Sequence, residues 1–151
     1  MIDFAAARQM MIDSQLRPNG VTDLRIIAAF QEVPREAFLP PEMANLAYLD
    51  RDVRWPAAEP GGSDRFLLKP MVTAKLIEAS AVTDRDRVLV IGSGSGYSAA
   101  IMARLAREVV ALDEGPIPVK ATDWLAAARN VGIVEGPLSE GWPAGGPYDV
   151  I

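Results

Sequence analysis

Residues 83–151 alternate between short apolar runs and longer helical stretches, and this alternation constrains the fold more than any other feature. The apolar runs are RVLVIG, REVVALD, VGIVEG and, at the end of the chain, PYDVI. The segments between the first three have the composition of helices, YSAAIMARLA and PVKATDWLAAARN. Strands that alternate with helices of this length form parallel sheets. We therefore expect an α/β domain whose fourth strand begins at the last residues.

The N-terminal fifty residues are rich in helix formers. The stretch FAAARQMMIDSQL predicts a first helix, which Pro18, Asn19 and Gly20 end. A second helix, VTDLRIIAAFQEV, is expected to begin at a cap formed by Thr22 or Asp23 and to end at Pro34. Its apolar spacing predicts a shared buried face of Leu24, Ile27, Ala28 and Val33. The prolines of PREAFLPPEMANLAYLD predict short helical pieces.

Residues 51–69 contain several prolines and glycines, and we expect a long loop there. Pro70 then opens the helix PMVTAKLIEAS, because proline suits a first turn whose N–H groups have no helical partner. We place a helical region at residues 1–82 and the sheet domain at residues 83–151. Doubly wound sheets have five or six strands, so we expect either a sequence truncated at its C-terminus, which we favour, or a partner that covers the open edge of the sheet.

The composition excludes several kinds of site. The chain has no cysteine and no histidine, which removes disulfides, thiolate chemistry, Ser-His-Asp triads and most zinc sites. We predict no metal site. A net charge of -5 and a pI of about 4.7 argue against a phosphate-binding face, so no nucleic-acid partner is expected. The sequence shows neither a membrane-spanning run nor a secretion signal, which favours a cytoplasmic protein with no membrane partner.

The turn after the first apolar run of the sheet domain reads GSGSGY, residues 92–97. Glycines let the backbone approach a ligand, and the first N–H groups of the following helix point outward without partners. The alternative is a tight turn that holds no ligand. Tyr97 stands where a dinucleotide fingerprint has glycine or alanine, and a P-loop motif is absent. The spacing therefore favours a nucleoside over a dinucleotide.

Asp113 ends the run REVVALD, on the strand that follows the glycine turn. A carboxylate at this strand end can accept hydrogen bonds from both ribose hydroxyls. The alternative is a role as a helix cap or turn residue, since the sequence after it is turn-like. Combined with the glycine turn, Asp113 favours ribose binding. The residues alone thus predict a nucleoside-binding α/β domain.

VLVIGSGSGYSAA together with REVVALDE resembles the S-adenosylmethionine site of class I methyltransferases, and more narrowly that of the protein-L-isoaspartate O-methyltransferase family. That family's helical N-terminal region is similar to RQMMIDSQLRPNGVTDLRIIAAFQEVPREAFLP followed by LAYLD, and its approach to the fourth strand is similar to GWPAGGPYDVI. The resemblance covers nearly the whole chain. It implies a Rossmann-like doubly wound sheet and S-adenosyl-L-methionine as cofactor. The implied reaction is protein repair: methyl transfer to the carboxylate of L-isoaspartyl residues in damaged proteins or peptides.

The resemblance also implies the residues that bind the cofactor. These are Gly92, Ser93, Gly94, Ser95, Gly96, Tyr97, Asp113 and Leu138. Where the family has G-D-G, with an acid toward the adenine amino group, this chain has Gly136-Pro137-Leu138. Either Glu135 or the backbone of Leu138 would then contact the adenine.

Three positions depart from the family pattern. Anchored on Lys69-Pro70, the segment DRFLLKP stands where the family has a G-Q-T-I-S-Q-P-type loop, so Phe66 and Leu68 replace hydroxyl-bearing residues. Val90 stands where the family usually has a glutamate that holds the amino-acid end of the cofactor. We therefore name no catalytic residue. The alternatives are a relative that binds the cofactor without repair activity, or a methyltransferase with another substrate.

Overall fold

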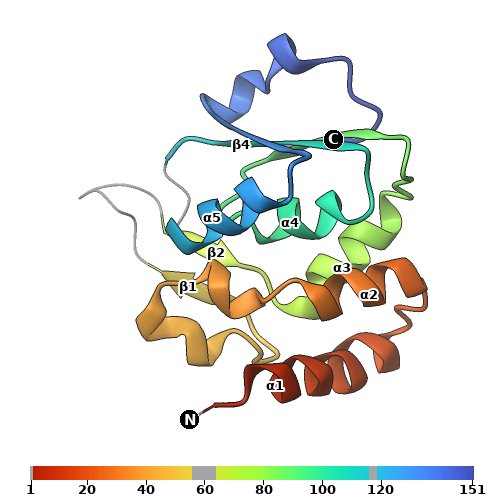
Figure 1. Cartoon of the computed structure of the whole chain (residues 1–151), viewed down its shortest axis with the longest axis vertical. Helices are drawn as coiled ribbons and strands as arrows, with labels where there is room; N and C mark the ends of the chain where they lie inside the picture. The colour runs from red at the N-terminus through yellow and green to blue at the C-terminus, as the bar shows by residue number, and fades with distance from the viewer. Residues whose placement is uncertain (1, 56–63, 116–118) are drawn as a thin grey trace.

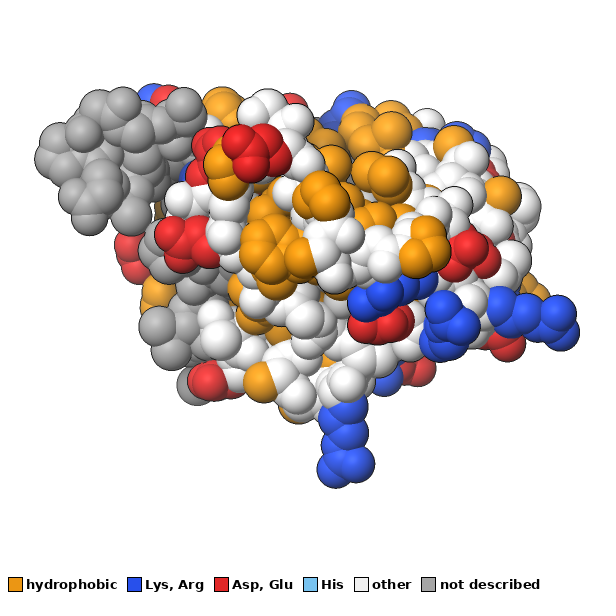
Figure 2. All heavy atoms as spheres, turned by 90° about the horizontal axis from the view of Figure 1, so that it is seen from above, with side chains coloured by type: hydrophobic (Ala, Val, Ile, Leu, Met, Phe, Trp, Pro, Cys, Tyr) orange, Lys and Arg blue, Asp and Glu red, His pale blue; other side chains and the backbone are white. Residues whose placement is uncertain are grey.

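The computed structural model describes residues 2–55, 64–115 and 119–151 (Figure 1). A layer of N-terminal helices packs beneath two helices that in turn lie against a parallel sheet (Figure 1). One hydrophobic cluster connects the layers, since it contains residues as far apart in sequence as Met11 and Leu125. A smaller cluster of Leu89, Val110 and Leu112 is formed within the sheet. Seen from above, hydrophobic side chains gather across the surface and charged ones lie mostly toward its margin (Figure 2).

The first predicted helix is present and changes its winding along its length. It begins as α1 (Phe4–Met11), where the Asp3 carboxylate accepts a hydrogen bond from the Ala6 N–H at 3.0 Å. It continues as a π-helical turn, η1 (Ile12–Leu16), and a short 3₁₀ segment, η2 (Arg17–Asn19). Gly20 ends it in the left-handed conformation, with φ of 78°. The predicted stop is confirmed.

Helix α2 (Leu24–Glu32) begins at Asp23, whose carboxylate accepts from the Arg25 N–H at 2.8 Å. The predicted buried face is wrong in two of its four members, because Leu24 is 74% exposed and Ala28 is also exposed. The residues of α2 that are buried are Ile26, Ile27, Ala29 and Phe30. Apolar residues occur on more than one side of this helix, so spacing alone pointed to a stripe rotated away from the real one.

The segments that follow α2 are short. The 3₁₀ turns η3 (Arg35–Phe38) and η4 (Pro41–Leu46) confirm the predicted helical pieces. The predicted loop at 51–69 is wrong at both ends, where β1 (Val53–Trp55) pairs antiparallel with β2 (Arg65–Leu67). Residues 56–63 of that loop lie outside the described residues. Strands of three residues carry too little periodicity to stand out beside prolines and glycines.

The parallel sheet follows the prediction. Helix α3 (Pro70–Ala79) leads to β3 (Arg87–Ile91), and β4 (Glu108–Asp113) and β5 (Val131–Glu135) come after it. Helices α4 (Tyr97–Ala103) and α5 (Val119–Ala127) connect these strands. The order is β3-β4-β5, with Val88 opposite Val109 and Val109 opposite Val131.

The predicted fourth strand lies on the other side of β3. Val150 forms a parallel bridge with Val88, and its carbonyl accepts from the Leu89 N–H at 3.0 Å. After β5, at one edge of the sheet, the chain therefore crosses to the opposite edge and pairs with β3. Strand order reverses at β3, and in open α/β sheets ligands bind outside the carboxyl ends of the strands at such a point. This arrangement is the expected Rossmann-like α/β fold.

Candidate functional site

The glycine turn leaves the carboxyl end of β3 at the point where the strand order reverses. The N–H groups of Gly92 and Ser93 both donate to the Leu112 carbonyl, at 2.9 and 3.0 Å, and so tie the turn to β4. Gly92, Gly94 and Gly96 have φ of 70°, 57° and 85°. Gly94 and Gly96 need this freedom, because a side chain would strain the left-handed backbone from which α4 begins.

Two segments approach the turn closely. A Cβ on Gly92 would lie 3.6 Å from Leu138 Cδ1, which comes from η5 (Leu138–Glu140) after β5. A Cβ on Gly94 would lie 3.9 Å from the carbonyl oxygen of Phe66, on β2. The structure therefore brings the glycine turn, Leu138 and strand β2 close together. The approach of Phe66 is a consequence of the hairpin that the sequence did not reveal.

The two serines of the turn differ in their partners. Ser95 is buried, and its Oγ accepts from the Tyr97 N–H at 3.3 Å. Ser93 is also buried, and its Oγ finds no hydrogen-bond partner among the described residues. Buried hydroxyls are nearly always hydrogen-bonded. Ser93 thus leaves a polar atom at the turn that a bound molecule could satisfy.

Asp113 is buried at the end of β4, with 3% of its surface exposed. Its Oδ2 accepts from the Gly94 N–H at 2.6 Å, and its Oδ1 accepts from the Glu114 N–H at 2.7 Å. The bond to Glu114 is the turn role that the sequence left open as an alternative. The bond to Gly94 places the carboxylate beside the glycine turn, which is the geometry that ribose binding requires.

Arg65 completes the surroundings of Asp113. Its guanidinium, on β2, forms an ion pair with Asp113 Oδ1. Gly115 makes room for it, since a Cβ there would lie 2.9 Å from Arg65 Nη2. Sequence reasoning missed Arg65, which is 48 positions from Asp113. No local pattern links residues so far apart, and the cation in DRFLLKP was the only available hint.

The Tyr97 side chain points into the core. Its ring packs edge-on against Phe30 and Phe38, with centroids 5.9 and 5.5 Å apart, and the Arg35 guanidinium lies 5.0 Å from its centroid. Burial raises the pKa of Tyr97 to about 12. Arg35 in turn donates to the carbonyls of Ala47 and Leu68, at 2.6 and 2.5 Å. Tyr97 therefore anchors α4 to the helical layer, and only its backbone faces the turn.

The two candidates for the adenine contact are Glu135, which ends β5, and Leu138, which begins η5 after it. Glu135 stands opposite Asp113 in the sheet register, and the following N–H, of Gly136, donates to the Asp113 carbonyl at 3.0 Å. The Leu138 N–H donates to Glu114 Oε1 at 3.3 Å. The backbone donor of Leu138 is thus engaged, and its side chain is the part that lies against the turn.

The three residues that depart from the family pattern, Phe66, Leu68 and Val90, are all apolar. Phe66 and Leu68 are 52% and 39% exposed, whereas Val90 is partly buried and packs against the main core. Leu68 and Val90 also line a cavity of about 330 Å³ between α3 and β3. Thr73 and Ser98 contribute hydroxyl groups to its lining. Hydroxyls therefore line the same cavity, but on helices rather than on β2.

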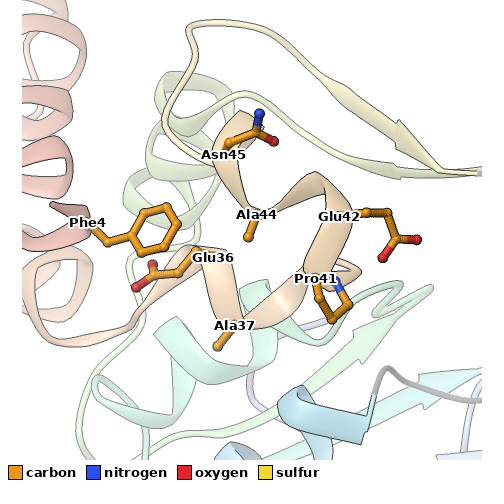
Figure 3. Close-up of a pocket in the computed structure, with 7 residues that line it drawn as sticks. All are labelled: Phe4, Glu36, Ala37, Pro41, Glu42, Ala44 and Asn45. Carbon is orange, nitrogen blue, oxygen red and sulfur yellow. The ribbon is translucent and has the colours of Figure 1, made fainter. Parts of the chain in front are cut away.

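Another cavity lies in the helical layer, between the start of α1 and the segment 36–45 (Figure 3). Its volume is about 410 Å³, and Phe4 and Glu36 point toward one another across it (Figure 3). The Glu36 carboxylate already accepts hydrogen bonds from Arg8 and from the Tyr48 hydroxyl. Its polar atoms are committed to holding α1 in place, so the glycine turn remains the better candidate site.

Two further observations bear on the kind of site. Among residues 2–55, 64–115 and 119–151, no cluster of three or more acidic, histidine or cysteine side chains is arranged to hold a metal ion. No helix in the described part of the chain is long and apolar enough to cross a membrane.

Comparison with known proteins places this geometry in context. Residues 6–151 match the family described as protein-L-isoaspartate(D-aspartate) O-methyltransferase (PCMT). Protein-L-isoaspartate O-methyltransferase 1 of Rhodopseudomonas palustris (strain HaA2) is 42% identical over 151 residues, which cover 98% of this chain and 59% of that protein. The corresponding protein of Methanoregula boonei is 41% identical over 95% of this chain and 65% of its own length. The chain thus spans about three fifths of these relatives.

A solved structure supports the same relationship. A protein-L-isoaspartate O-methyltransferase superposes with a TM-score of 0.75 and 30% sequence identity. The match covers 95% of this chain and 46% of that one. The helical layer and the sheet are therefore both part of the shared fold.

Proposed function

This chain belongs to the protein-L-isoaspartate(D-aspartate) O-methyltransferase family, and we propose that it serves methyl transfer from S-adenosyl-L-methionine to the carboxylate of L-isoaspartyl residues in damaged proteins and peptides. One observation carries the proposal: the buried Asp113 carboxylate is hydrogen-bonded to the Gly94 N–H at the strand-order reversal. A carboxylate beside a glycine turn suits an adenosine ribose at the site where open α/β sheets bind ligands.

The chain's own residues fit such a cofactor. The positive-φ glycines Gly92, Gly94 and Gly96 would let the backbone approach a ligand, and the Ser93 hydroxyl, which has no partner among the described residues, would supply a polar contact. Asp113 would accept the ribose hydroxyls, and the Leu138 side chain would cover the adenine side of the turn. When bound, the cofactor supplies an electrophilic sulfonium methyl group. The residues around the turn orient it, and Tyr97 fixes the start of α4 behind them.

The acceptor side needs little acid or base chemistry. A carboxylate has a pKa of about 4 in model peptides, so the attacking oxygen is already ionised at neutral pH. The protein has mainly to align the oxygen with the methyl group. Phe66 and Leu68 offer no hydrogen bond for this purpose, and one lost bond to a charged group costs about 1.5–3 kcal/mol. The proposal therefore assigns no catalytic side chain.

The test is transfer of a labelled methyl group from S-adenosyl-L-methionine to an isoaspartyl peptide. The same peptide with an ordinary aspartyl residue is the control. We expect label on the isoaspartyl peptide only. Equal or absent labelling of the two peptides contradicts the repair function, and cofactor binding without transfer supports a relative that binds the cofactor and lacks this activity.

We propose the cytoplasm as the location, a boundary near residue 82 between helical region and sheet domain, and isoaspartyl proteins rather than nucleic acids as partners. The net charge of -5 supports the last point, because it disfavours contact with a phosphate backbone.

A further inference from the structure

We propose that Arg65 sets the affinity for the cofactor, because its guanidinium occupies the Asp113 oxygen that a ribose hydroxyl requires and must leave before a nucleoside binds. The inference rests on the proposed function, which gives Asp113 its ribose role. It goes beyond that function by naming a residue of this chain that competes with the ligand.

The acceptor positions of Asp113 show the competition. A carboxylate has about four such positions, two on each oxygen. The Glu114 N–H and Arg65 both occupy Oδ1, and the Gly94 N–H takes one position on Oδ2. Among the described residues, a single acceptor position therefore remains, and it lies on Oδ2. A ribose diol presents two neighbouring donors, one to each oxygen, so the diol and Arg65 compete for Oδ1.

Burial explains why a cation is present. The Asp113 side chain is only 4% exposed, and a buried carboxylate without a compensating cation is costly. Arg65 supplies that charge from the neighbouring hairpin. Two backbone N–H groups remain on the carboxylate when Arg65 departs, so the anion keeps its hydrogen bonds to Gly94 and Glu114.

The hairpin allows the side chain to move without its backbone. The backbone of β2 is held by its pairing with β1 and, just after the strand, by the Leu68 carbonyl, which accepts from Arg35, and the Lys69 N–H, which donates to Asp52 at 2.8 Å. The Arg65 side chain itself is 29% exposed. Release therefore requires a rotamer change toward solvent rather than an opening of the fold. The apparent dissociation constant equals the intrinsic constant divided by the fraction of molecules in which Arg65 is released from Asp113.

Calorimetry with S-adenosylhomocysteine tests the inference on the wild type and on Arg65→Gln, in about 0.05 M and 0.5 M salt. We expect Arg65→Gln to bind about three- to tenfold more tightly at low salt. The difference in affinity between the wild type and Arg65→Gln should be smaller at high salt, because screening weakens the ion pair of the wild type. Equal or weaker binding by Arg65→Gln overturns the inference.

Arg54→Gln is the matched control. Arg54 lies on the same hairpin, loses the same charge on substitution, and pairs with the more exposed Asp64 instead of Asp113. We expect it to change affinity by less than about twofold. A gain equal to that of Arg65→Gln would show a general effect of net charge and overturn the competition. Circular dichroism and melting temperatures establish that each variant is folded.

Adenosine and 2′,3′-dideoxyadenosine separate the diol from the rest of the ligand. We expect Arg65→Gln to increase the affinity for adenosine and not for the dideoxy compound. An equal increase in affinity for both compounds overturns the inference. The proposed function fails separately: no binding of S-adenosylhomocysteine by any folded variant contradicts it. Binding by the wild type without a gain in Arg65→Gln contradicts only the role of Arg65.

Discussion

The two walls of the candidate site are built from different chemistry. On the cofactor wall, the backbone N–H of Gly94 and the buried carboxylate of Asp113 provide fixed polar groups. On the acceptor wall, Phe66 and Leu68 are exposed and apolar. The first wall is part of the sheet, whereas the second is the β1–β2 hairpin, and Arg65 links them. Cofactor affinity and acceptor recognition should therefore respond to different substitutions.

The largest expected effect is on the cofactor wall, at Asp113. Asp113→Asn removes the charge that we propose accepts the ribose hydroxyls, and it leaves Arg65 without its partner. We expect S-adenosylhomocysteine to bind about 100-fold more weakly, since hydrogen bonds to charged groups contribute about 1.5–3 kcal/mol each. Calorimetry measures this. Asp64→Asn, which removes an exposed carboxylate paired with Arg54, is the control. Unchanged binding by Asp113→Asn would rule out the ribose contact.

Tyr97, which supports the same wall from behind, gives a prediction for stability at alkaline pH. Its pKa is raised to about 12 by burial, so the folded state holds this proton when the unfolded state, with a pKa of about 10, has lost it. The contribution of Tyr97 to the free energy of unfolding is therefore fully present below pH 10 and is lost as the pH rises toward 12. The loss reaches about 2–3 kcal/mol.

Urea unfolding at pH 8 and pH 11 measures about half of this loss, about 1.4 kcal/mol, because pH 11 lies one unit above the unfolded pKa. The contribution of Tyr97 is the part of the pH dependence that Tyr97→Phe removes. Tyr48→Phe is the comparison, because burial and the neighbouring Glu36 also raise the pKa of Tyr48. Equal pH dependence in the wild type and Tyr97→Phe would show that the phenol of Tyr97 ionises in the folded protein.

Gly94 tests the backbone part of the cofactor wall. Gly94→Ala places a side chain at φ of 57°, which costs about 1–2 kcal/mol and shifts the N–H away from Asp113. We expect about tenfold weaker binding of S-adenosylhomocysteine and a lower melting temperature. Gly132→Ala on β5 is the control, because its Cβ would meet nothing within 4 Å. Wild-type affinity in Gly94→Ala would show that the turn tolerates a rearranged backbone.

The two walls also differ in how much of them could be predicted. The cofactor wall follows from local patterns: the run that forms β3, the glycines after it, and the acid that ends β4 all lie in short segments with one periodicity. The acceptor wall depends on pairing between Val53 and Leu67, fourteen positions apart, and on strands of three residues. Neither the pairing nor such short strands leave a local sequence pattern, so a loop was expected where the hairpin lies.

The buried face of helix α2 likewise depends on more than its own sequence. The spacing of α2 permits several apolar stripes, and the helices packed against it, such as α4 with Tyr97 against Phe30, decide that Phe30 is buried and Leu24 is exposed. Arg65 and Asp113 are likewise joined by the fold and not by any motif. Elements that depend on one segment, such as the strands β3 and β4, could be predicted, whereas a contact between two distant segments could not.

The smallest effect is expected on the acceptor wall, where it also distinguishes the two walls most clearly. Leu68→Ser restores a hydroxyl at a position that is 39% exposed and lines the cavity with Val90. The hydrogen bonds of the Asp113 carboxylate go to Arg65, Gly94 and Glu114 and do not involve Leu68. Cofactor affinity should therefore change by less than about twofold, while methyl transfer to an isoaspartyl peptide rises up to about tenfold if the hydroxyl aligns the carboxylate. Leu24→Ser, on α2 and 74% exposed, is the matched control for loss of an apolar side chain away from this cavity. A change in cofactor affinity without a change in transfer would show that Leu68 belongs to the cofactor wall, and the separation of the two walls would then be wrong.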